Sequence, residues 1–105
     1  MEGFQRVGRV DEIPAGGSKV VQVDGKSIVV FNVEGHFYAI YGLCPHEGGP
    51  LGKGRLKGFV VSCPWHDLAF DVRNGQSTDG GGYCIGSYEV CVKENDIFIG
   101  RRRTV

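Results

Sequence analysis

Apolar and polar residues alternate along much of the chain, and this period of two predicts short β-strands. The alternation is clearest between residues 87 and 93, where Tyr88, Val90 and Val92 occupy every second position. Similar segments, short and rich in Val, Ile, Phe and Tyr, lie at 4–7, 19–23, 27–33, 36–41, 58–62, 68–72 and 97–100. The sequence at 11–14 ends in proline and predicts no more than a single helical turn.

Turn-forming dipeptides separate these segments. Asp24-Gly25 and Asn74-Gly75 favour tight hairpins, because both residues of each pair tolerate a positive φ. Glu34-Gly35 and the run at 94–96 are weaker signals of the same kind. The pattern predicts an all-β fold, a small antiparallel β-sandwich or partly open barrel. No linker or repeat interrupts it, so we expect a single domain over residues 1–105.

Composition narrows the function class. The 105 residues include 12 basic and 12 acidic side chains, and this balance gives no reason to expect nucleic acid or an anionic membrane as partner. No apolar stretch approaches the roughly 18 residues of a membrane-spanning helix. The N-terminal residues are polar and charged, unlike a secretory signal, which favours a cytoplasmic protein with reduced thiols. The four cysteines are therefore expected to be metal ligands or buried apolar groups and not disulfides.

Two loops rich in Gly and Pro, at about 42–52 and 62–67, break the strand pattern and carry the candidate chemistry. The first contains Cys44 and His46, and the second contains Cys63 and His66. Two thiolates and two imidazoles form a ligand set that suits zinc or an iron–sulfur cluster. Because each loop supplies one sulfur and one nitrogen, the pattern fits a centre with two metals. A tetrahedral zinc site is the alternative.

The motifs Cys44-Pro45-His46 and Cys63-Pro64-Trp65-His66 resemble those of Rieske iron–sulfur proteins, and the likeness extends over nearly the whole chain. The resemblance implies one [2Fe–2S] cluster per chain, held by two Cys on one iron and two His on the other. Carried over by position, Cys44 and Cys63 would bind the inner iron. His46 and His66 would bind the outer iron, near the surface.

Departures from the family pattern indicate which branch of the Rieske family the chain resembles. Respiratory-complex members join their two loops by a disulfide, and the corresponding positions here are Gly49 and Trp65. They also place Ser and Tyr hydroxyls where this chain has Leu68 and Phe70. The chain instead resembles a stand-alone Rieske-type ferredoxin of a ring-hydroxylating oxygenase system. It also departs at Gly80-Gly81-Gly82, where relatives often have a Pro-containing third loop.

This resemblance implies a one-electron carrier and not an enzyme. Electrons would come from an NAD(P)H-dependent flavoprotein reductase and pass to a terminal oxygenase, through transient contacts near His46 and His66. Only His36 remains once the cluster has its ligands, so neither a catalytic nucleophile set nor an oxygenase's mononuclear iron site can be assembled. The alternatives are a small Rieske-like subunit of an assimilatory nitrite reductase and a zinc-stabilised β interaction domain.

Several remaining residues have structural expectations. Trp65 is expected to pack over the second loop, with a docking role as the alternative. Cys84 and Cys91 are expected to be buried apolar thiols. His36 is expected at the surface, and the run at 101–103, three arginines, is expected to be a solvated terminus.

Overall fold

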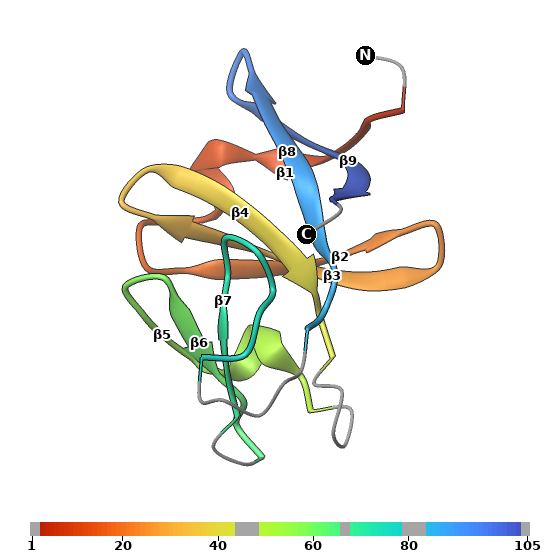
Figure 1. Cartoon of the computed structure of the whole chain (residues 1–105). Coiled ribbons are helices and arrows are strands. Elements are labelled where there is room, and N and C mark those ends of the chain that lie inside the picture. Colours follow the sequence, from red (N-terminus) through yellow and green to blue (C-terminus); the bar gives the residue numbers. More distant parts are fainter. Residues whose placement is uncertain (1–2, 44–48, 66–67, 79–83, 104–105) are drawn as a thin grey trace.

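The computed structural model describes residues 3–43, 49–65, 68–78 and 84–103 (Figure 1). Within these residues the strands are β1 (Gln5–Arg9), β2 (Ser18–Val23), β3 (Lys26–Val33), β4 (His36–Tyr41), β5 (Arg55–Lys57), β6 (Val60–Ser62), β7 (Ala69–Asp71), β8 (Ser87–Lys93) and β9 (Asp96–Arg103). Two 3-10 turns are η1 (Val10–Glu12) and η2 (Leu51–Lys53). The all-β fold class is confirmed, and η1 is the helical turn that the sequence predicts.

The strands form two antiparallel sheets. The larger sheet has the order β1-β9-β8-β4-β3-β2, and the smaller sheet has the order β5-β6-β7. The outer strands β1 and β2 of the large sheet come into contact, so this sheet curls towards a partly closed barrel. Figure 1 shows the small sheet, in green and teal, below the large one. We call these parts the large-sheet half and the cluster half; the latter comprises the small sheet and the two Gly- and Pro-rich loops.

Strand β3 separates two hydrophobic cores, because it is buried on both faces. Ile28 and Val30 point into a core inside the curled large sheet, which also contains Ile97 and Ile99. Val29, between them, points into a core shared with the small sheet. The other members of this second core include Phe31, Val33, Ile40, Leu51, Val61, Cys63, Phe70, Val72 and Ile85. The period of two in β3 therefore serves two packing surfaces at once.

Two-residue turns connect the hairpins of the large-sheet half. Three of them have positive φ at both central residues, at Asp24-Gly25, Glu34-Gly35 and Glu94-Asn95. This geometry matches the right-handed twist of paired strands. The tight turn expected at Asn74-Gly75 is wrong: only Gly75 has a positive φ. The Asp71 amide donates to the Gln76 carbonyl at 2.9 Å, which closes a four-residue loop instead.

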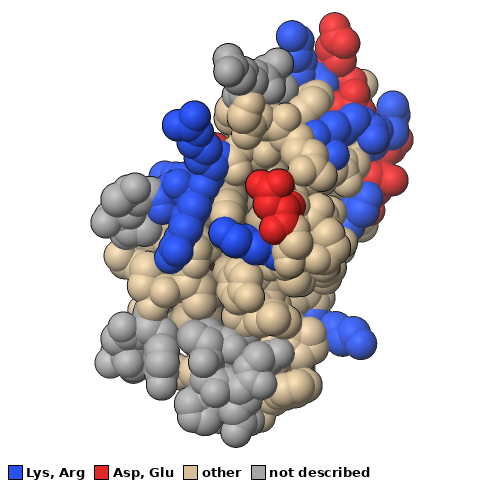
Figure 2. Space-filling view, turned by 90° about the vertical axis from the view of Figure 1, so that its right-hand side faces the viewer, with Lys and Arg blue, Asp and Glu red and all other residues tan. Residues whose placement is uncertain are grey.

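Two further differences concern polar strands. β5 was not predicted, because three residues with one apolar side chain, Leu56, carry no periodic signal; its pairing with β6 makes it a strand. The arginines at 101–103 are exposed as expected, but they extend β9. On the face shown in Figure 2, most charged side chains of both signs lie over the upper part of the molecule, the large-sheet half. No helix among the described residues is long and apolar enough to cross a membrane.

Candidate metal centre

Each of the two candidate loops is closed at its base by a backbone hydrogen bond. In the first loop the Leu51 amide donates to the Gly42 carbonyl at 2.9 Å, and Leu43 forms an antiparallel bridge with Pro50. In the second loop the Cys63 amide donates to the Leu68 carbonyl at 2.8 Å. The described ends of both loops lie at the same end of the molecule, the lower end in Figure 1. The fold therefore brings the described ends of the two motif-bearing loops to one end of the molecule.

Of the candidate ligands, the structure describes Cys63. Cys44, His46 and His66 lie outside the described residues, as does the Gly80-Gly81-Gly82 run. Within the described ranges there is no group of three or more His, Cys, Asp or Glu side chains that could hold a metal. The ligand set thus stays a prediction, and the described residues test only the surroundings of Cys63.

Cys63 follows β6 directly and is buried, with 5% of its surface exposed. It belongs to the core shared by the two sheets, together with Val61 and Phe70. A thiolate held in an apolar, water-excluded position is a suitable soft ligand for iron in a cluster. This burial fits the inner-iron position that the resemblance implies.

Gly49 of the first loop lies directly against the Cys63 sulfur. A Cβ atom placed on Gly49 would stand 2.7 Å from the Cys63 Sγ and 3.3 Å from Cδ2 of the Trp65 ring. Real Cβ atoms do not approach other heavy atoms to 2.7 Å, so only glycine leaves room for the sulfur here. The burial of Cys63 and the donor chemistry of its sulfur fit the [2Fe–2S] group that the resemblance implies.

Trp65 was expected to pack over the second loop, with a docking role as the alternative. Its ring lies beside Gly49 of the first loop, where an ideal Cβ would stand 3.3 Å from Cδ2, and not only over the second loop as expected. Its exposed fraction is nevertheless 59%, so much of the indole faces solvent at the cluster end. An exposed aromatic side chain is also typical of protein–protein contacts.

No hydroxyl is present at the two positions that supply hydrogen bonds in the respiratory branch. Phe70 is fully buried in the shared core, and Leu68 is half-buried against it. Beside Cys63 lies an open cavity of about 660 Å³, whose lining includes the basic side chains of Lys53 and Arg55.

The expectation for the two remaining cysteines is wrong for Cys84, which is exposed, while Cys91 is partly buried. Cys84 precedes β8 and is held by an isolated bridge to Gln76, and no sheet among the described residues packs over it. Cys91 faces away from the neighbouring Val90, which contacts the large-sheet core. His36 is exposed, as predicted.

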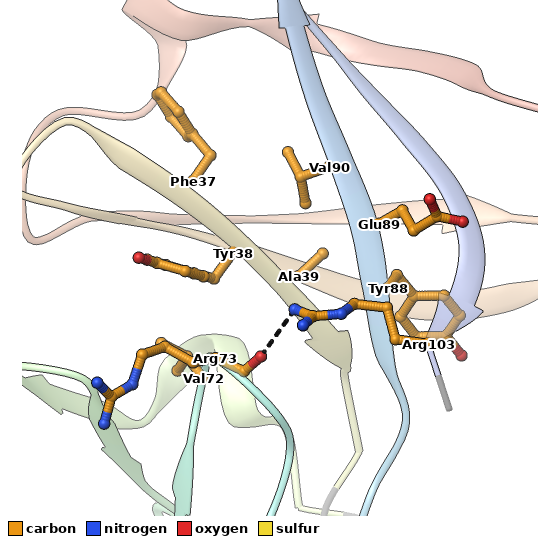
Figure 3. Close-up of a pocket in the computed structure, with 9 residues that line it drawn as sticks. All are labelled: Phe37, Tyr38, Ala39, Val72, Arg73, Tyr88, Glu89, Val90 and Arg103. Atoms are coloured by element: carbon orange, nitrogen blue, oxygen red, sulfur yellow. Dashed lines mark hydrogen bonds between the residues drawn. The ribbon is translucent and has the colours of Figure 1, made fainter. Parts of the chain in front are cut away.

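A second hollow, of about 320 Å³, lies between β4 and β8 (Figure 3). The two strands pair only at Ala39–Tyr88 and Ile40–Ser87 and then diverge. Across this hollow Arg103 Nη1 donates to the Arg73 carbonyl at 3.1 Å, as the dashed line in Figure 3 shows. This bond connects β9 of the large sheet to the turn that follows β7.

Phe59, which lies against the Arg73 guanidinium, also joins the two halves. The guanidinium lies 4.1 Å from the centre of the Phe59 ring, and Tyr38 of β4 meets Phe59 edge-on at 5.9 Å. Nη2 of Arg73 contacts Asp71 Oδ2 at 2.8 Å. The hydrogen bond from the Arg73 side chain holds the pKa of the Asp71 carboxyl below its usual value, against the opposing effect of burial. The small sheet is thereby fixed against β4 and β9.

Comparisons with known proteins agree with this geometry. A naphthalene 1,2-dioxygenase/salicylate 5-hydroxylase ferredoxin component of Ralstonia sp is 40% identical over 68 residues, 65% of this chain and 65% of the relative. The biphenyl dioxygenase ferredoxin subunit of Pseudomonas sp. (strain KKS102) is 38% identical over 70% of this chain and 68% of its own. The matched region thus spans just under two thirds of the first of these relatives.

Solved structures give the same result. The ferredoxin of carbazole 1,9a-dioxygenase from Nocardioides aromaticivorans IC177 superposes with a TM-score of 0.89 at 28% identity, covering 94% of this chain and 98% of its own. A chain from a complex of reduced oxygenase and oxidised ferredoxin in carbazole 1,9a-dioxygenase covers 100% of this chain and 99% of its own, with a TM-score of 0.90 at 27% identity. Residues 3–82 match the Rieske [2Fe-2S] domain. The chain therefore belongs to the Rieske [2Fe–2S] domain family, whose cofactor is a single [2Fe–2S] cluster.

Proposed function

We propose that this protein is a one-electron carrier, which accepts electrons from an NAD(P)H-dependent flavoprotein reductase and delivers them to a terminal oxygenase. The observation that carries the proposal is the buried Cys63 sulfur lodged against Gly49 of the other loop, in a chain whose family binds a [2Fe–2S] cluster. The relatives named as ferredoxin components of dioxygenase systems support a carrier and not an enzyme.

The proposed ligands are Cys44 and Cys63 for the inner iron, and His46 and His66 for the outer iron. The cluster, when bound, supplies a centre that gains and loses one electron. The contribution of the chain is to hold these ligands on two loops with closed bases and to keep water from the Cys63 sulfur. We also propose that residues 1–105 form one domain, with cluster-binding loops at about 42–52 and 62–67. The shared strand β3 supports this.

The proposed partners dock near His46 and His66. A solved complex that contains an oxygenase and a ferredoxin of similar fold supports an oxygenase as one of them. The exposed face of Trp65 is an aromatic surface suited to a transient contact at the same end. The reductase is inferred from the kind of system to which the relatives belong. We place the protein in the cytoplasm, where such systems and reduced thiols occur together.

A metal and spectral analysis tests the cofactor. Protein purified without oxygen is expected to contain about two irons and two acid-labile sulfides per chain, with visible and EPR signals of a His-ligated cluster. Replacing His46 or His66 by Ala is expected to abolish or alter these signals, whereas Cys84→Ala leaves them intact. A colourless protein with one zinc per chain would instead identify the zinc-stabilised domain.

A single-turnover experiment tests the carrier role. The protein is reduced, mixed with an oxidised ring-hydroxylating oxygenase, and followed by stopped-flow absorbance. The expected result is reoxidation that depends on oxygenase concentration. Reoxidation only by an assimilatory nitrite reductase would instead support the nitrite reductase subunit.

A further inference from the structure

Gly49 of the first loop lies between two side chains of the second loop. A side chain at Gly49 would project into the gap between the Cys63 sulfur and the Trp65 ring. An ideal Cβ would stand 2.7 Å from the sulfur, 3.3 Å from Cδ2 of the ring and 3.4 Å from Cγ. Gly49 does not have the positive φ that makes glycine necessary in many turns. The requirement for glycine at this position is therefore one of space.

The Cys63 side of this gap does not yield easily. Cys63 is 5% exposed, and its amide is fixed by the hydrogen bond to the Leu68 carbonyl. Its side chain belongs to the core that includes Val61 and Phe70, so the sulfur has little room to retreat. Trp65, two residues later, closes the other side of the gap with its ring.

The backbone hydrogen bonds at the loop bases do not connect the loops to each other. The bond from Leu51 to Gly42 closes the first loop on itself, and the bond from Cys63 to Leu68 closes the second. The close approach of Gly49 to Cys63 and Trp65, where an added Cβ would meet both side chains, crosses from one loop to the other. A ring packed on a glycine backbone gives close contact without a side chain that must be ordered.

We propose that Gly49 and Trp65 form a noncovalent clasp that joins the two loops and fixes the position of the Cys63 sulfur. Trp65 is then a positioning residue, which acts on the cluster through Cys63. This inference rests on the proposed role of Cys63 as a cluster ligand. The part of the Trp65 ring that faces Gly49 then positions the Cys63 sulfur, and the exposed face of the ring stays free for a partner contact.

The test compares four variants of the purified protein. Trp65→Ala removes the ring, whereas Trp65→Phe keeps a ring next to Gly49. Gly49→Ala places a Cβ 2.7 Å from the Cys63 sulfur, so the sulfur has to shift relative to the first loop. Gly52→Ala is the matched control in the same loop, because its new Cβ would meet the Val20 side chain at 2.6 Å, and Val20 is 51% exposed and free to turn outwards.

Three readouts are measured: EPR g-values, the rate of cluster bleaching by an iron chelator, and the rate of Cys63 alkylation followed by mass spectrometry. Trp65→Ala is expected to accelerate bleaching and alkylation roughly fivefold or more, while Trp65→Phe stays close to wild type. Gly49→Ala is expected to shift the g-values, because the ligand sulfur moves. Gly52→Ala is expected to leave the g-values and the alkylation rate unchanged.

The outcomes separate the clasp from the proposed function. A wild-type protein without a [2Fe–2S] signal would refute the proposed function, and the clasp would still be judged by the protection of the Cys63 thiol in that same protein. Unchanged alkylation and bleaching in Trp65→Ala would overturn the clasp. So would equal losses in Trp65→Ala and Trp65→Phe, since the ring contact would then be irrelevant. If Trp65→Ala fails to fold, Gly49→Ala decides, and unchanged g-values and alkylation in it would overturn the proposal.

Discussion

The large-sheet half and the cluster half of the molecule are built in different ways. The large-sheet half has strands of five to eight residues, two-residue turns and its own core around Ile28, Val30, Ile97 and Ile99. The small sheet of the cluster half has three strands of three residues each. Its buried residues share a core with the inward side of β3. One half is held by strand pairing and packing, and the other needs further constraints.

The described contacts show what those constraints are. Phe59, with the Arg73 guanidinium against its ring, packs on Tyr38 of the large sheet, and the Cys63 sulfur lies next to Gly49. The proposed cluster would add bonds between the two loops. The unfolded chain has no formed metal site, so binding of the cluster stabilises the folded state. The stability of the cluster half should therefore depend on the cofactor far more than that of the large-sheet half. Four experiments test this contrast.

Loss of a proposed ligand should have the largest effect. His46→Ala is expected to lose or convert the cluster, and hydrogen exchange should then accelerate at β6 and β7 while the amides of β9 stay protected. The measurement is exchange detected by mass spectrometry, beside the visible spectrum. Cys84→Ala and Cys91→Ala are the controls and should keep both the spectrum and the protection. Uniform loss of protection in both halves would contradict the contrast.

Two neighbouring residues of β3 provide a matched pair. Val29 and Val30 are both fully buried, but Val29 faces the shared core and Val30 faces the large-sheet core. Val29→Ala and Val30→Ala should each lower the free energy of unfolding by about 2 kcal/mol, from lost burial and a residual cavity. Only Val29→Ala should also speed the loss of iron to a chelator. Equal rates of iron loss would show that the two cores do not act separately.

The reduction potential tests the surroundings of the cluster. Without hydroxyls at Leu68 and Phe70 the midpoint potential should be roughly −150 mV, the low end of the range for Rieske centres. The double variant Leu68→Ser with Phe70→Tyr introduces two hydroxyls. Each hydrogen bond of about 1 kcal/mol from a hydroxyl to a cluster sulfur should raise the midpoint potential by about 40 mV, because donors stabilise the more negative reduced state. Protein-film voltammetry measures both proteins, with the single variants as controls. A wild-type midpoint above zero would show that other donors dominate.

The smallest effect concerns acid stability, and each half contains one carboxyl that reports it. Hydrogen bonds lower the pKa of Asp71, chiefly from the Arg73 side chain, and of Glu12, chiefly from the Arg9 amide. A lowered folded-state pKa gives stability that is present above the unfolded-state pKa and lost as the pH falls through the folded-state value. Asp71→Asn should therefore flatten the acid dependence of protection at β6 and β7.

Glu12→Gln should flatten the acid dependence of protection in β1 and β2 instead, because Glu12 Oε1 also contacts Lys19 Nζ at 3.0 Å. Hydrogen exchange at a series of pH values measures both variants. Interchanged effects, with Asp71→Asn acting on β1 and β2, would show that the two halves are coupled through β3.

The sequence predicts the large-sheet half better than the cluster half. The period of two is visible in long strands, whereas β5, with Leu56 as its single apolar side chain, exists because β6 pairs with it. Asp24-Gly25 forms its predicted turn. Asn74-Gly75 does not, because Val72 is buried and Asp71 accepts a hydrogen bond from the Arg73 amide, which lengthens the loop. The β5 strand and the longer loop thus depend on tertiary contacts, which the local sequence propensity does not predict.

The candidate site shows the same division. Spacing and residue type predict the pairs Cys44/His46 and Cys63/His66 as ligands, because the side chains that bind metals can be recognised from the sequence. The role of Gly49 was not predictable in this way, because it depends on how closely two loops approach after folding. The exposure of Cys84 was missed for a related reason: an apolar thiol is buried only if a sheet packs over it, and none among the described residues does.

The three two-residue turns also set an order of events in time. Hairpins with such short connections form within roughly 1–10 μs, because little chain entropy is lost in closing them. The β2–β3, β3–β4 and β8–β9 hairpins are of this kind, while the pairings of β4 with β8 and of β1 with β9 join distant parts of the chain. Nascent chains should thus have the local hairpins of the large-sheet half before iron arrives. Cluster insertion is then a late step of maturation, and it takes place after β3 and β4 have paired.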